Sequence, residues 1–137
     1  MNVKYFYKDT SFRLVKEEEY NYLIDNIIHR EGYKRGEISI IFTSDKTILN
    51  LNNKFLNRDY LTDVIVFSNS FKNIVTGDVY IGIERLRENS IKYSEGNLER
   101  EIKRIIIHGI LHLIGYGDKS KEDKEIMTAR EELYLQS

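Results

Sequence analysis

Two histidines four residues apart, His108 and His112, are the side chains of this sequence whose type and spacing best suit chemistry. They lie in the stretch HGILHLIGYGDK, residues 108–119, which is otherwise strongly apolar. On an α-helix, residues at i and i+4 point the same way, so both rings would offer a nitrogen to one metal ion. The pair alone leaves two interpretations open, because a buried histidine is often a hydrogen-bonded core residue and not a ligand.

The residues that follow the pair favour a metal site. Gly115 and Gly117 let the chain leave the helix sharply, because glycine accepts a positive φ. Asp118 follows His112 by six residues, and a carboxylate on this loop can turn back toward the rings. Two histidines and one carboxylate leave an open coordination position, as a catalytic zinc site requires. The alternative is that Asp118 only precedes or caps the last helix beside Ser120.

The residue after the first histidine argues against a zinc peptidase. Peptidases with this histidine spacing carry a glutamate there as general base, whereas this chain has Gly109. Glycine permits close packing but moves no proton, so a peptidase of that type is not expected. The third histidine, His29, has no partner nearby in the sequence and is expected on the surface.

Composition excludes several classes of protein. The chain has 137 residues, a net charge of −1 and no cysteine, so it has neither disulfides nor thiolate metal sites. That charge gives no general attraction to nucleic acid or to anionic lipid. No apolar run approaches the length of a membrane span, and we expect a cytoplasmic protein that does not contact the membrane. The length and the absence of a linker predict a single domain, residues 1–137.

The elements that must position the histidines alternate between strands and helices in the first part of the chain. Strands are predicted at residues 3–7, 37–42, 64–67 and 78–83. Helices are predicted at residues 16–31, 44–56, 85–93, 97–114 and 120–134. The pattern predicts an α+β fold, in which a small mixed sheet of about four strands is flanked by helices, with the metal cleft at the C-terminal helix.

Polar side chains form one stripe along the predicted helix 97–114. Glu101, Arg104, His108 and His112 share a sector of the helical wheel that differs from the apolar sector. After Ile105, the residues around this stripe are apolar. The two imidazoles therefore continue a polar stripe into a region that we expect to be buried.

Three stretches, in order, resemble the motifs of the YbeY family of bacterial rRNA-maturation endoribonucleases. HGILHLIGYGD, residues 108–118, is similar to the family's HGxLHLxGYDH. LNNKFLNRDYLTDVIVFS, residues 51–68, is similar to its LN…R…TDVLSF segment, with Arg58, Thr62 and Asp63 in place. TGDVYIGIE, residues 76–84, is similar to its GDI strand. The resemblance covers most of the chain from residue 51 to residue 118.

The resemblance implies a metal-dependent endoribonuclease that cleaves single-stranded RNA in small-subunit rRNA maturation and ribosome quality control. Its implied partners are the rRNA precursor and the ribosome. His108 and His112 are then the first two ligands of one divalent ion. The family's third ligand is a histidine where this chain has Asp118, and Gly117 replaces the usual preceding aspartate. Zinc is the favoured ion, although a carboxylate suits a harder ion such as manganese better than imidazole does.

By the same resemblance, Arg58 is the expected catalytic residue. Its guanidinium has paired donors that cannot deprotonate, which suit the negative charge of a phosphoryl transition state. Thr62 and Asp63, just before a predicted buried strand, are expected to form a turn or to support Arg58 or the metal site from outside. The identity of the general base, the choice between water and the 2′-hydroxyl as nucleophile, and the oligomeric state are left open.

Two other functional classes stay open. One is a metal-dependent hydrolase of another substrate, which activity on peptides without activity on RNA would indicate. The other is a non-catalytic ribosome-associated module in which the metal only holds the C-terminal helices together. Both an endoribonuclease and a ribosome-associated module must contact RNA, and this contact must rest on local positive charge, because the net charge is close to zero. Candidate contacts are Lys46, Lys54, Arg58, Arg85, Arg87, Arg104 and Lys119.

Overall fold

The computed structural model describes residues 3–56 and 62–136, and the structural statements below concern these residues. Among them, no helix has both the length and the hydropathy that crossing a bilayer requires. Strands and helices follow one another in the order β1 (Lys4–Lys8), α1 (Glu17–Arg30), β2 (Lys34–Thr43), α2 (Asp45–Leu56), β3 (Val64–Ser68), β4 (Ile74–Gly82), α3 (Ile83–Tyr93), α4 (Leu98–Ile114) and α5 (Lys121–Leu135).

The strands form one mixed sheet in the order β1-β2-β4-β3. β2 runs parallel to both β1 and β4, whereas β3 pairs antiparallel with β4. Parallel neighbours need a crossover connection, which α1 supplies between β1 and β2. The four strands and the surrounding helices confirm the predicted α+β fold with a mixed sheet.

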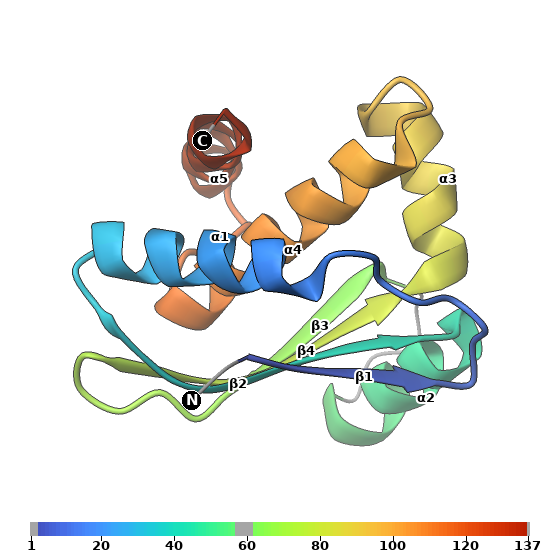
Figure 1. The fold of residues 1–137 in the computed structure, drawn as a ribbon, viewed down its shortest axis with the longest axis horizontal. Coiled ribbons are helices and arrows are strands. Elements are labelled where there is room, and N and C mark those ends of the chain that lie inside the picture. Colours follow the sequence, from blue (N-terminus) through green and yellow to red (C-terminus); the bar gives the residue numbers. More distant parts are fainter. Residues whose placement is uncertain (1–2, 57–61, 137) are drawn as a thin grey trace.

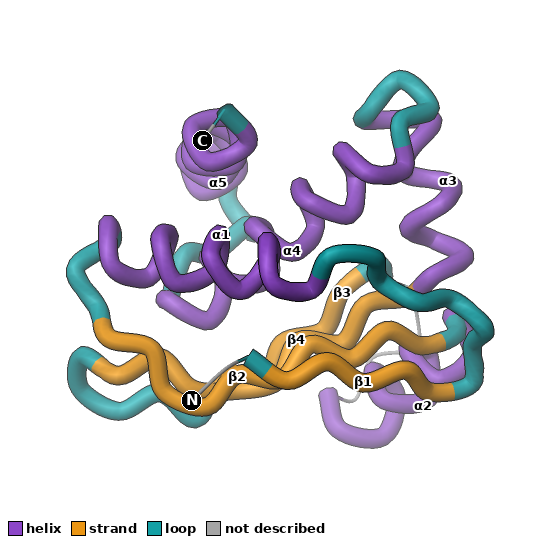
Figure 2. The backbone as a smooth tube through the Cα atoms, viewed as in Figure 1, coloured by secondary structure: helices purple, strands orange, loops and turns teal. Residues whose placement is uncertain are grey.

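The helices cover the two faces of the sheet unequally (Figure 1). α1, α3, α4 and α5 lie on one side, and α2 lies on the other, as the backbone tube in Figure 2 also shows. The main core lies on the first side, where Ile40 and Phe42 of β2 and Ile105 and Ile106 of α4 are fully buried. This layer of isoleucine-rich packing fixes α4 against the sheet, and it therefore also fixes the backbone positions of His108 and His112.

Close packing of α4 on the sheet depends on Gly109. A Cβ atom at Gly109 would lie 2.6 Å from Val79 Cγ1 on β4, which is closer than two carbon atoms can pack. The absence of a side chain therefore lets the helix approach β4. The same glycine that argues against a peptidase base thus has a packing role between the two histidines.

Most predicted boundaries lie within two residues of the observed ones, and the largest differences are at the starts of two strands. The strand predicted at 37–42 begins at Lys34, and the strand predicted at 78–83 begins at Ile74. These two added segments pair with each other, Lys34 with Ile74 and Arg35 with Val75. The backbone pairing extends both strands, although polar side chains such as Lys34 give no apolar pattern there.

The loop that carries Asp118 has defined ends. Gly115 closes α4 at a φ of 125°, in the region that favours glycine. Ser120 opens α5, and its side-chain oxygen accepts a hydrogen bond from the Asp123 backbone N–H at 3.0 Å. Ser120, and not Asp118, is therefore the residue that caps the last helix.

Candidate metal centre

The two histidines lie on the last turns of α4, and their Nε2 atoms are 3.0 Å apart. Asp118 Oδ2 lies 3.3 Å from His112 Nε2 and 3.8 Å from His108 Nε2. In a tetrahedral zinc site with bonds of about 2.0–2.2 Å, two ligand atoms lie roughly 3.3–3.6 Å apart. The three observed distances bracket that range. The structure thus brings the three predicted ligands together at the spacing of ligands of one ion.

The other ring nitrogen of each histidine has its own partner. His108 Nδ1 lies 2.5 Å from Glu131 Oε2 on α5, and His112 Nδ1 lies 2.8 Å from the backbone carbonyl oxygen of Tyr116. These oxygens accept, so each Nδ1 carries a proton, and a ring that is neutral in this arrangement has its lone pair at Nε2. The two Nε2 atoms and the Asp118 carboxylate therefore converge, and with both rings neutral this is an arrangement that a bound cation satisfies.

The surroundings of His112 favour its neutral form. Burial lowers the pKa of the His112 ring below its ordinary value, and the neighbouring His108 lowers it further. Asp118 and the Tyr116 carbonyl act in the opposite direction without reversing the shift. Because a metal binds the neutral imidazole, this shift keeps His112 ready as a ligand near neutral pH.

The three side chains open into a cleft of about 410 Å³. The side chains of His108 and His112 are 15% and 20% exposed, whereas Asp118 on its loop is 48% exposed. The cleft is lined by Asn52, Thr62, Asp63, Val64, Ile65, Val66, Ser68, His108, His112 and Asp118. A larger hollow of about 560 Å³, near Tyr20 and Lys103, has no histidine in its lining, so we place the candidate site in the smaller one.

The predicted supporting residues Thr62 and Asp63 both line this cleft. Asp63 Oδ2 accepts a hydrogen bond from Asn89 Nδ2 at 3.0 Å and lies 4.0 Å from Arg104 Nη2. The backbone carbonyl of Asp63 also accepts from the backbone N–H of Gly82, at 3.0 Å. Asp63 is thus held by several partners at the edge of the cleft. Arg58, the predicted catalytic residue, lies outside the described residues.

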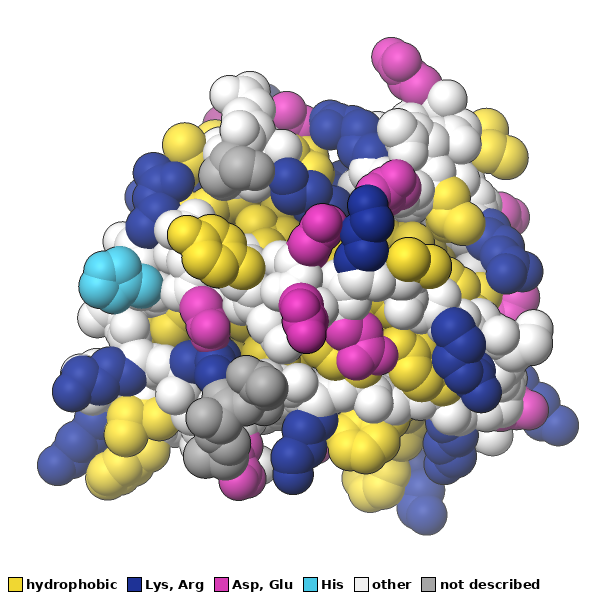
Figure 3. Space-filling model, in the orientation of Figure 1, with side chains coloured by type: hydrophobic (Ala, Val, Ile, Leu, Met, Phe, Trp, Pro, Cys, Tyr) yellow, Lys and Arg dark blue, Asp and Glu magenta, His cyan; other side chains and the backbone are white. Residues whose placement is uncertain are grey.

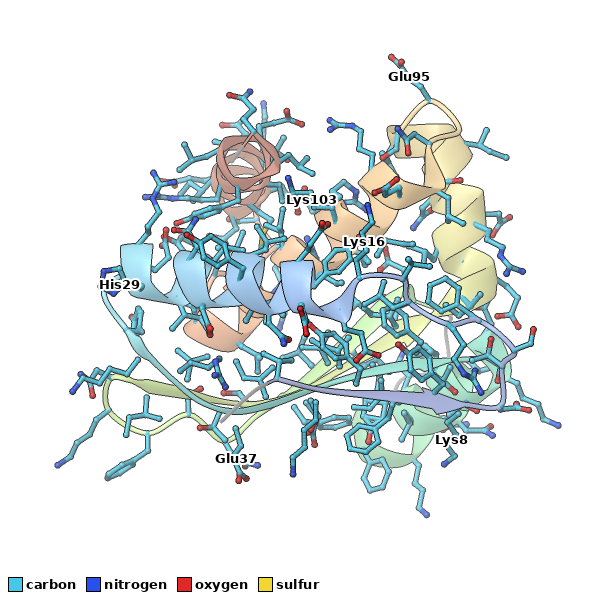
Figure 4. The ribbon with its side chains drawn as sticks, in the orientation of Figure 1. Lys8, Lys16, His29, Glu37, Glu95 and Lys103 are labelled. Atoms are coloured by element: carbon cyan, nitrogen blue, oxygen red, sulfur yellow. The ribbon has the colours of Figure 1, made fainter. Side chains whose placement is uncertain are left out.

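Two residues at this site were missed or misassigned by sequence reasoning. Glu131 is 23 positions from His108 and on another helix, so no spacing rule connects them. Arg104 was a candidate for RNA contact, but its side chain is only 16% exposed and is bound to Glu101 and Glu131. The sequence does carry a signal for the partly buried position of Arg104, because Arg104 shares the polar stripe of the helix with Glu101 and His108. The third histidine, His29, is exposed at the end of α1, as expected (Figure 4).

Comparisons with known proteins agree with the motifs. The sequence model of the family described as Endoribonuclease YbeY matches residues 5–137. Relatives named Endoribonuclease YbeY include that of Karelsulcia muelleri, 41% identical over 130 residues that cover 95% of this chain and 92% of the relative. That of Cytophaga hutchinsonii is 37% identical and covers 96% and 92%. The solution structure of TM1509 from Thermotoga maritima shares the fold, with a TM-score of 0.66 at 24% identity over 96% of this chain and 87% of that one.

Proposed function

The chain belongs to the YbeY family of endoribonucleases, and on that premise we propose that it is a metal-dependent endoribonuclease specific for single-stranded RNA. The observation that carries the proposal is the convergence of His108, His112 and Asp118 in one cleft. We propose the rRNA precursor of the small subunit as the substrate, with a further role in ribosome quality control in the cytoplasm. These finer assignments rest on the resemblance of the motifs.

We propose zinc as the ion, bound by the Nε2 atoms of His108 and His112 and by the carboxylate of Asp118. When bound, a divalent ion supplies Lewis acidity to a phosphoryl oxygen and acidifies water near neutral pH. Glu131 and the Tyr116 carbonyl keep the Nδ1 protons away from the centre, so both rings are oriented as ligands. Asp118 adds a negative charge that a third imidazole would not, which makes manganese the main competitor of zinc.

The described lining of the cleft contains no lysine or arginine. On the face that Figure 3 shows, basic and acidic side chains are intermixed and no field of one sign covers the surface. Beyond the charge of the ion, we assign the positive charge at the transition state to Arg58, on the resemblance of the motif that contains it. The cleft wall from β3, Val64–Val66, is largely apolar, and such a wall strengthens the attraction between a guanidinium and a phosphoryl group.

A cleavage assay with matched RNAs tests the proposal. Wild-type protein, metal-stripped protein and zinc-reloaded protein would each be given one RNA sequence as a single strand and as a duplex. We expect cleavage of the single strand, loss of cleavage on stripping and recovery with zinc. His112→Ala should stay inactive after zinc addition, whereas the exposed histidine variant His29→Ala should behave as wild type. Full cleavage by His112→Ala, or cleavage of peptides without cleavage of RNA, would contradict the proposal.

A further inference from the structure

We infer that Glu131 is a positioning residue for the metal centre and that Arg104 holds Glu131 in place. This inference rests on the proposed metal site and extends it to two residues that do not touch the ion. Glu131 lies on α5, which packs beside α4 (Figure 1), and its side chain is 9% exposed. Glu131 lies outside the sequence motif that contains His108, so the motif does not reveal its role.

Both oxygens of Glu131 are engaged by groups on α4. Oε2 lies 2.5 Å from His108 Nδ1, and Oε1 accepts from Arg104 Nη1 at 3.3 Å. If the His108 ring turned over, a ring carbon would replace Nδ1 and the short hydrogen bond would be lost. Glu131 therefore fixes both the orientation and the tautomer of His108, so that the lone pair of Nε2 faces His112 and Asp118.

Arg104 is itself held by several partners. Its Nε donates to Glu101 Oε1 at 2.8 Å and its Nη2 donates to Glu101 Oε2 at 2.6 Å, a two-point contact with a fully buried carboxylate. Ser94 Oγ donates to the same Glu101, at 2.9 Å. Burial lowers the pKa of Arg104, but the hydrogen bonds that it donates to Glu101 and the charges of Glu101, Glu131 and Asp63 raise it above its ordinary value. The guanidinium is therefore a fixed cation against which Glu131 is aligned.

The charges of this network do not balance within it. One guanidinium, of Arg104, faces three carboxylates, of Glu101, Glu131 and Asp63, and Glu131 also contacts the His108 ring. A divalent cation in front of His108 complements the excess of carboxylates. The network also joins α4, α5 and the start of β3, the elements around the cleft.

Zinc affinity in variants of two neighbouring glutamates shows whether Glu131 acts by positioning His108 or only by its negative charge. Glu132 follows Glu131 on α5, is 54% exposed and pairs with Arg100 at 3.5 Å, so Glu132→Gln removes the same charge one residue away. Competition with a chromophoric chelator would give the zinc dissociation constant of each purified protein. We expect Glu131→Gln to weaken zinc binding by about 10- to 100-fold, the usual effect of losing such a partner. Glu132→Gln should leave the affinity unchanged.

Nitrogen NMR of the imidazoles in the metal-free protein gives a readout that does not require bound zinc. In the wild type, His108 should be protonated at Nδ1, and in Glu131→Gln it should populate both tautomers. Circular dichroism would confirm that the variant folds, and Glu131→Asp, which keeps the charge on a shorter side chain, replaces it if the variant does not. Unchanged zinc affinity and an unchanged His108 tautomer in a folded variant would overturn the inference. Wild-type protein that binds no zinc would instead overturn the metal centre, while the tautomer would still test the role of Glu131.

Discussion

Two polar clusters meet at Tyr116, and they differ in how their acceptors are satisfied. In the first, the buried carboxylate of Glu31 accepts from the hydroxyl groups of Tyr116, at 2.5 Å, and Tyr134, and from Arg130 Nη1, at 3.4 Å. In the second, the Nε2 atoms of His108 and His112 converge with the Asp118 carboxylate, and two neutral rings protonated at Nδ1 offer only acceptors to this centre. The first cluster is complete as it stands, whereas a bound cation would complete the second. Proximity of polar groups alone thus does not mark a ligand site; unmatched acceptors do.

The first cluster, of Glu31, Tyr116, Tyr134 and Arg130, is called the closed cluster below, and the second, of His108, His112 and Asp118, the open cluster. The closed cluster also supports the open one. The Tyr116 side chain bonds Glu31, while the backbone carbonyl of the same residue accepts the Nδ1–H of His112. The hydrogen bond to Glu31 raises the pKa of the Tyr116 hydroxyl, and burial together with Glu31 raises that of Tyr134 to about 12. Both phenols therefore remain protonated donors at physiological pH, and the bond from Tyr116 to Glu31 ties down the loop that follows α4.

The largest expected effect is the loss of metal from the open cluster. His108→Ala or His112→Ala removes one of three converging ligands, so metal content should fall from one ion per chain to nearly none. Elemental analysis of proteins purified without added metal measures this, with His29→Ala as the matched control. Full occupancy in both variants would show that the site is wrongly assigned.

The next effect concerns catalysis without metal loss. Arg58→Ala should reduce RNA cleavage by something like a hundredfold or more, the loss expected for one preorganised charge stabiliser. Its metal content and melting temperature should stay close to wild type, because most surface substitutions change stability by less than about 0.5 kcal/mol. Arg58→Lys should recover cleavage only in part, since an ammonium cannot span two phosphoryl oxygens. A collapse of stability in Arg58→Ala would assign Arg58 to the scaffold instead.

A substitution in the closed cluster should change stability before it changes metal binding. Glu31→Gln replaces charge-assisted hydrogen bonds to two tyrosines and Arg130, and it should lower the free energy of unfolding by about 1–3 kcal/mol. Chemical denaturation of the metal-free protein measures the loss. Zinc affinity should change less than in Glu131→Gln. The reverse order of effects would remove the distinction between the two clusters.

The smallest expected effect comes from the third ligand. Asp118→His restores the three-imidazole set of the motif that the sequence resembles, and zinc should then leave more slowly in the presence of a chelator. Stopped-flow release of zinc from wild type, Asp118→His and Asp118→Ala would give the three rates. An unchanged rate in Asp118→His, with zinc still bound in Asp118→Ala, would exclude Asp118 as a ligand.

The sequence predicts those parts of the fold and the site that depend on local spacing. Periodicity places each helix, and the i, i+4 rule places His108 and His112 on one side of α4. Glu131 contacts His108 across 23 positions of the chain and Glu31 contacts Tyr116 across 85, so only tertiary packing reveals these contacts. The early starts of β2 and β4 likewise depend on pairing between distant segments. The single domain and the role of Arg58 remain predictions.

Anomalous diffraction from crystals grown with zinc tests the central claim most directly. Data collected above and below the zinc absorption edge would locate the ion independently of any assumption about its ligands. The predicted result is one peak per chain, about 2.0–2.2 Å from the Nε2 atoms of His108 and His112 and from an Asp118 carboxylate oxygen. A cleft without a peak, or a peak bound by other side chains, would contradict the claim that these three residues form the metal centre.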